Sequence, residues 1–175
     1  YEEAEVLFAR LGALSSLSSV QQSTGHVLVQ LGRKREARRF YERALKIDRA
    51  RGATLFEING LISLVALDLE KPDALDLIQQ ADQMARRLGV ARMQLVVWRF
   101  LGRLHTNHGD LSAATACYDE ALALAADHGQ RGYHAEVIGD RAILERLRSP
   151  PDAAAATITG WLDGLSGHHR APAGE

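Results

Sequence analysis

The chain has 175 residues, of which 46% are hydrophobic and 25% charged, and its formal net charge is −1 at pH 7. This composition is typical of a globular domain, and the small net charge excludes attraction of the whole chain to nucleic acid or anionic lipid. A single cysteine excludes an internal disulfide and a cysteine-based zinc site. Charges or glycines interrupt every apolar stretch well before ~18 residues, so we expect neither a membrane span nor a signal peptide.

Glycine and proline divide the sequence into segments with the apolar spacing of amphipathic helices. Alanine, leucine and arginine are abundant, which favours helix, and no run of alternating β-branched residues indicates a strand. In chain order, the expected helices cover residues 1–18, 19–31, 33–51, 53–69, 72–88, 90–108, 110–128, 130–148 and 150–166. Pro72 suits the first turn of its helix, where the missing N–H costs little. We therefore predict an all-α fold, followed by a disordered tail over residues 167–175.

The clearest helix pair lies in the second half of the chain. Trp98, Leu101 and His105 share one helical face, and Gly102 leaves that face flat enough for a neighbouring helix to come close. Gly109 ends the helix, since glycine suits a helix C-terminus. The next helix places small and large residues on one face: Ala114, Tyr118, Ala121 and Ala125.

This pattern resembles the tetratricopeptide repeat, W-x2-L-G-x2-aromatic followed by A-x3-aromatic-x2-A, although His105 replaces the usual tyrosine. The first alanine of the motif recurs at intervals of 33, 37, 40 and 40 residues, as Ala4, Ala37, Ala74, Ala114 and Ala154. The resemblance implies a right-handed α-solenoid of antiparallel helix pairs over residues 1–166, with about four repeats plus a terminal helix. The helix over 1–18 would then be half of a truncated repeat.

The resemblance also implies a concave groove lined by the first helix of each pair, where family members usually hold peptides or helices of other proteins. Register places the following residues there: Gln22, His26, Asn59, Ser63, Arg99, Arg103, Asn107, Glu136 and Asp140. Arg99 and Arg103 favour an acidic partner, because guanidinium groups bind carboxylates in a bidentate fork. Solvated arginines without a ligand are the alternative. The lysine–asparagine clamp of chaperone-binding members is not reproduced, so we expect no chaperone-tail ligand.

Two other features have a plain structural interpretation. The helix over 33–51 carries nine basic and three acidic residues, a net charge of +6. Such a helix can contact nucleic acid, but the polar outer face of an amphipathic helix is the favoured interpretation. His105 and His108 have the spacing of a zinc-binding pair but lack a third ligand, so a structural role is favoured over a metal site. Cys117 shares the Ala114 face and is expected to be a buried, inert thiol.

No catalytic or nucleotide-binding motif occurs in the sequence, so we expect no enzymatic activity and no cofactor. We predict a non-catalytic scaffold that binds a protein or peptide. A module for self-association or intramolecular docking, nucleic-acid contact through 33–51 and a small-molecule ligand between helices stay open as alternatives, whereas a membrane partner is not expected. The long repeats resemble those of large bacterial signalling and transcriptional regulators, and the chain begins with Tyr1 rather than methionine. We therefore expect it to be the interaction module of a larger cytoplasmic protein.

Overall fold

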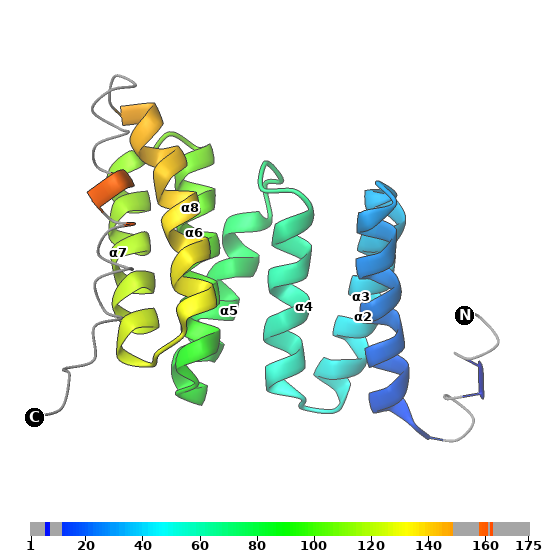
Figure 1. The fold of residues 1–175 in the computed structure, drawn as a ribbon. Helices are drawn as coiled ribbons and strands as arrows, with labels where there is room; N and C mark the ends of the chain where they lie inside the picture. Colours follow the sequence, from blue (N-terminus) through cyan, green and yellow to red (C-terminus); the bar gives the residue numbers. More distant parts are fainter. Residues whose placement is uncertain (1–5, 8–11, 149–157, 161, 163–175) are drawn as a thin grey trace, which may run out of the picture.

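The computed structural model describes residues 6–7, 12–148, 158–160 and 162. Every regular element in these ranges is helical, which confirms the all-α prediction. The helices, labelled as in Figure 1, are α2 (Leu14–Gln30), α3 (Lys34–Ala50), α4 (Thr54–Leu67), α5 (Ala74–Leu88), α6 (Ala91–Asn107), α7 (Leu111–Asp127) and α8 (Arg131–Arg148). The tail predicted over 167–175 lies outside the described residues, as does most of the helix predicted over 150–166.

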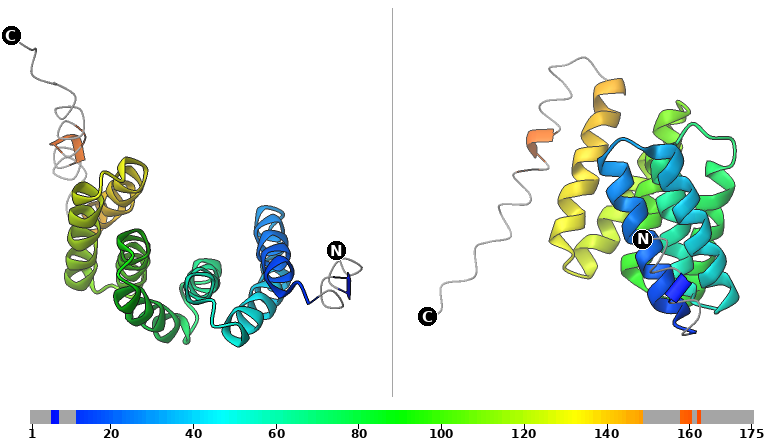
Figure 2. Two further views of the ribbon diagram at one scale, coloured as in Figure 1. Left: turned by 90° about the horizontal axis from the view of Figure 1, so that it is seen from below. Right: turned by 90° about the vertical axis from the view of Figure 1, so that its right-hand side faces the viewer.

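The helices form an arc of antiparallel neighbours joined by short turns (Figures 1 and 2). Each helix packs against the next one in the chain, and α4, α6 and α8 also contact one another in turn. Seen along the helices, on the left of Figure 2, α2, α4, α6 and α8 line the concave edge, while α3, α5 and α7 form the convex edge. This arrangement is the helical solenoid that the sequence pattern predicts.

Glycines with a left-handed backbone close most of the turns. Gly12, Gly32 and Gly52 have positive φ angles and recur 77 residues later as Gly89, Gly109 and Gly129. The same shift of 77 residues converts α2 into α6, from Leu14–Gln30 to Ala91–Asn107, and α3 into α7. Glycine adopts this conformation without steric cost, so α2, α3, α5, α6 and α7 end sharply. The chain therefore repeats a unit of two helix pairs.

Two predicted helix boundaries are wrong. The helix predicted over 1–18 does not continue to residue 18, because Gly12 has a φ angle of 66° and α2 already begins at Leu14. Pro72 does not lie in the first turn of α5. Instead, Asp68 is extended after α4, and Pro72 belongs to a turned connection that precedes Ala74. Residues 1–5 and 8–11 of the predicted first helix lie outside the described ranges.

A glycine–tyrosine contact holds the two best-defined helix pairs together. A Cβ atom on Gly102 would lie 2.5 Å from Cε1 of Tyr118, and a Cβ atom on Gly25 would lie 2.5 Å from Cε1 of Tyr41. Both tyrosines are almost fully buried. The prediction that Gly102 admits a close neighbour is confirmed, and the neighbour is an aromatic ring.

Cys117 lies in the core, and burial raises the pKa of its thiol to about 11. Because the thiolate is the reactive form, about one folded molecule in 10³ presents it at pH 8. We expect Ellman's reagent to label the native chain very slowly at pH 8 and the urea-unfolded chain at the rate of a free cysteine. Equal rates would contradict this burial.

The buried thiol of Cys117 also makes stability depend on pH. Since the folded chain holds the proton more tightly, the stability that this group contributes is complete below the ordinary pKa of 9 and falls as the pH rises toward 11.

Candidate functional site

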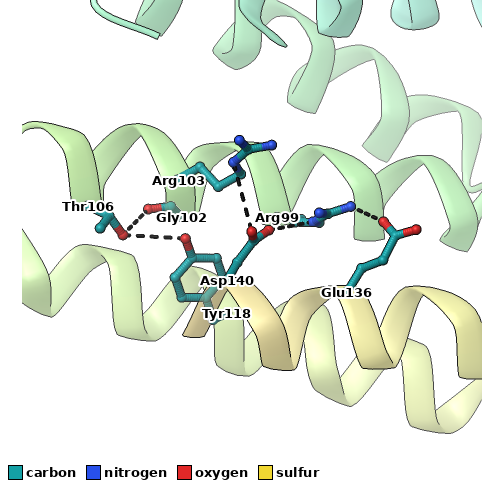
Figure 3. Close-up of polar contacts among 7 residues, drawn as sticks. All are labelled: Arg99, Gly102, Arg103, Thr106, Tyr118, Glu136 and Asp140. Atoms are coloured by element: carbon teal, nitrogen blue, oxygen red, sulfur yellow. Dashed lines mark hydrogen bonds and ion pairs between the residues drawn. The ribbon is translucent and has the colours of Figure 1, made fainter. Parts of the chain in front are cut away.

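The candidate site lies where α6 and α8 meet, toward the C-terminal end of the concave edge (Figure 3). Arg99 and Arg103 extend from α6 toward α8. The Nε atom of Arg99 donates to Oδ2 of Asp140 at 2.5 Å, and its Nη1 atom pairs with Glu136. The Nε atom of Arg103 lies 4.0 Å from Oδ1 of Asp140. Four of the predicted groove residues thus form one charged network.

The prediction that both arginines bind an acidic partner therefore does not hold for Arg99, which pairs with carboxylates of the chain itself. Arg99 is largely covered, with 17% of its side chain exposed, because two carboxylates of α8 already compensate its charge. The two arginines are four residues apart on α6, and Glu136 and Asp140 are four residues apart on α8. One turn of α6 therefore faces one turn of α8. Arg103 keeps 38% of its side chain exposed and is the more accessible cation.

A pocket with a volume of about 280 Å³ opens beside this network. It draws side chains from α6, α7, α8 and the connection between α4 and α5. The lining residues are Leu69, Arg103, Thr106, Asn107, Tyr118, Asp140, Ile143 and Leu147. The pocket therefore combines polar side chains of α6 and α7 with apolar side chains of α8 and Leu69.

Tyr118 contributes a hydroxyl that the sequence pattern does not reveal. Its ring passes against Gly102, and its Oη atom reaches to 3.3 Å from Oγ1 of Thr106, which donates to the Gly102 carbonyl at 2.8 Å (Figure 3). Burial raises the pKa of Tyr118 to about 12, so this hydroxyl is neutral at pH 7. The sequence signal for this reach is Gly102, because only a residue without a side chain lets the ring approach α6 so closely.

The predicted groove residues of the N-terminal half do not converge in the same way. Gln22 turns to the buried Asp48, and the His26 ring packs edge-on against Tyr41 with centroids 5.4 Å apart. Asn59 and Ser63 are half-buried on α4, which is not in close contact with α2. We therefore place the candidate site in the C-terminal half.

Asp48 is a buried polar centre that the sequence analysis does not identify. The carboxylate is fully buried and accepts hydrogen bonds from Oγ of Ser18 at 2.7 Å and from Nε2 of Gln22 at 3.1 Å. Nη1 of Arg51 lies 3.4 Å from its other oxygen. These contacts join the end of α3 to the middle of α2 and orient Gln22.

The basic helix α3 lies on the convex edge. Ion pairs with acidic residues of the same chain compensate part of its charge. Arg33 pairs with Glu36, Arg38 with Glu42 and Asp73, and Arg49 with Glu57. The exposed cations that form no ion pair with a described residue are Lys34, Arg35, Arg39 and Lys46. Nucleic-acid contact through this helix stays the less favoured, untested alternative.

The described residues contain no group of three or more histidine, cysteine or acidic side chains that could hold a metal ion. Nδ1 of His105 instead lies 4.0 Å from the carboxylate of Asp110. Among the helices in the described ranges, none combines the length and the hydropathy that crossing a membrane requires.

The fold and its concave surface define the class of helical-repeat solenoids, whose extended inner surfaces bind other molecules. Residues 20–51 and 97–128 each match the model of the tetratricopeptide repeat family. They contain the Gly25–Tyr41 and Gly102–Tyr118 contacts. Such repeats generally mediate protein–protein interaction and are not catalytic.

A similar solved structure is the crystal structure of BtubC (BKLC) from P. vanneervenii, which is 20% identical to this chain with a TM-score of 0.70. The similarity covers 93% of this chain and 69% of that one. At this identity the likeness concerns the fold alone. None of the curated proteins matches the sequence.

Proposed function

We propose that the chain is a non-catalytic scaffold that binds a protein or peptide partner on its concave face, at the seam of α6 and α8. The observation that carries the proposal is that Ile143 and Leu147 remain 56% and 60% exposed beside the pocket. Exposed apolar side chains gathered at a hollow indicate an interaction surface. The repeats at 20–51 and 97–128 support the same function.

The setting of this scaffold is also part of the proposal. The length of the repeats supports a place in a larger regulatory protein of bacterial type, acting in the cytoplasm. An acidic partner is supported by the exposed Arg103 rather than by the arginine pair, because Arg99 already binds Glu136 and Asp140.

A second candidate function is docking of another helix pair, or of a second copy, on the face of α2 that carries Val27 and Leu31. These side chains are 51% and 64% exposed, whereas Leu104, the counterpart of Val27 in α6, is fully buried in the core shared with α4 and α5. The same face of α2 therefore lacks the cover that its counterpart has among the described residues. This observation supports self-association or intramolecular docking.

Two matched double variants separate these functions, since each places glutamate at two exposed apolar positions four residues apart. We expect Ile143→Glu/Leu147→Glu to abolish capture of a partner from the source lysate, and Val27→Glu/Leu31→Glu to leave it unchanged. Circular dichroism checks that both variants are folded. Capture that survives the first variant would overturn the concave site. Capture lost only with the second variant, or a lower mass of that variant in light scattering, would favour docking on α2.

A further inference from the structure

The chemistry of the pocket points to a particular kind of peptide. We propose that the pocket beside Arg103 takes one apolar side chain of a partner peptide, and that Arg103 binds a carboxylate on the residue next to it. This inference rests on the proposed function and specifies its ligand as an acidic–apolar peptide segment.

The size and lining of the pocket indicate a single apolar side chain. Its volume of about 280 Å³ lies just below that of small-molecule sites, which begin at about 300 Å³. Ile143 and Leu147 are one helical turn apart on α8, and Leu69 adds an apolar contact from the α4–α5 connection. An aliphatic or aromatic side chain would cover the two exposed residues and lose contact with water.

The more accessible of the two charged groups at the pocket is the cation Arg103. Arg103 and Asp140 are the charged lining residues, but Asp140 is only 14% exposed and its Oδ2 atom is bound by Arg99. Arg103 is 38% exposed, and its contact with Asp140 at 4.0 Å is too long for a hydrogen bond.

The guanidinium of Arg103 is also held ready for a ligand. Its Cζ atom lies 5.2 Å from the centroid of the Phe100 ring, which orients the planar group while its N–H donors stay unused among the described residues. Asn107 is exposed on the same wall of the pocket and offers an amide donor beside it. A carboxylate placed here gains charge-assisted hydrogen bonds.

The test is an NMR titration of the full ¹⁵N-labelled chain with blocked tetrapeptides at millimolar concentration, which detects weak binding. We expect acetyl-Gly-Leu-Glu-Gly-amide to shift the backbone amides of Asn107, Ile143 and Leu147. The Leu-Gln peptide should bind at least about fivefold more weakly because it lacks the charge. The Ala-Glu peptide should bind at least about tenfold more weakly because it leaves the pocket unfilled.

Two charge-reversal variants complete the design. Arg103→Glu should reverse the preference, so that a Leu-Lys peptide binds better than the Leu-Glu peptide. Arg39→Glu, on the convex helix α3, should leave the preference unchanged. Equal binding of the Leu-Glu and Leu-Gln peptides, an unchanged preference in Arg103→Glu, or shifts away from the pocket would each overturn the proposal. Pocket amides that respond to no peptide, as when another part of the chain covers them, would also overturn it.

The failure of this inference is distinguishable from failure of the scaffold function. If no peptide discriminates while Ile143→Glu/Leu147→Glu still abolishes partner capture, the concave scaffold stands and the acidic–apolar chemistry is wrong. If partner capture also survives that double variant, both proposals are wrong.

Discussion

Replacing Asp48 with alanine is expected to lower the free energy of unfolding by about 3 kcal/mol, which is a large part of the stability of a domain this size. The substitution removes a fully buried carboxylate and leaves the hydroxyl of Ser18, which is 1% exposed, without its acceptor. The amide of Gln22 loses the same partner. Urea unfolding followed by circular dichroism measures the change.

The second half of the chain supplies the control for this prediction. The positions 77 residues after Ser18 and Asp48 hold Leu95 and Ala125, both 1% exposed in one apolar cluster. Adding Ser18→Leu to Asp48→Ala places the apolar pair of the second half at these two positions. The double variant is therefore expected to regain most of the lost stability. An additive loss in the double variant, or a loss below about 1 kcal/mol in Asp48→Ala, would contradict the importance of the network.

Gly102→Ala is expected to destabilise the chain by about 2 kcal/mol, although alanine is the better helix former by about 1 kcal/mol. The added Cβ atom would lie 2.5 Å from Cε1 of Tyr118 and 2.9 Å from its Cζ atom. Tyr118 is 1% exposed, so its ring cannot move aside without disturbing the packing around it. Thermal and urea unfolding measure the loss.

Gly139→Ala is the matched control, because Gly139 is an exposed glycine inside α8 with no atom within 4 Å of an added Cβ. Here only the helix preference acts, so stability should rise by about 0.5–1 kcal/mol. The same chemical change thus has opposite signs at two helical positions. A gain of stability in Gly102→Ala as well would mean that the tyrosine contact is not rigid.

The fold could be predicted from the sequence because its signals are local. Turn glycines and the recurring alanines mark each helix pair, and most predicted ends agree with the structure within a few residues. Gly12 does not stand out as a turn, because the helix formers Ala13 and Leu14 follow it directly. Only its similarity to Gly89, 77 residues later, distinguishes it from a mid-helix glycine. Pro72 is equally compatible with the first turn of a helix and with a connection between helices. The structure has a connection here, because the chain leaves α4 at the extended Asp68.

The site could be predicted only in part. Register places Arg99, Arg103, Glu136 and Asp140 on facing helices, but which cation binds which carboxylate depends on the separation of α6 and α8. The pocket needs side chains from four segments of the chain, so no single pattern reveals it. The centre at Asp48 leaves a trace in the sequence, since polar Ser18 and Asp48 stand where the later unit has Leu95 and Ala125.

The recurrence of the turn glycines has a consequence for how chains of this kind change length. Gly12 and Gly89 have nearly the same φ angle, 66° and 68°, and they precede helices with the same number of residues. A recombination event that joins one glycine to the other would delete or duplicate an integral cassette of 77 residues without creating a new type of junction. Length could then vary by whole cassettes, while the final copy keeps Arg103 and the pocket residues of α6, α7 and α8.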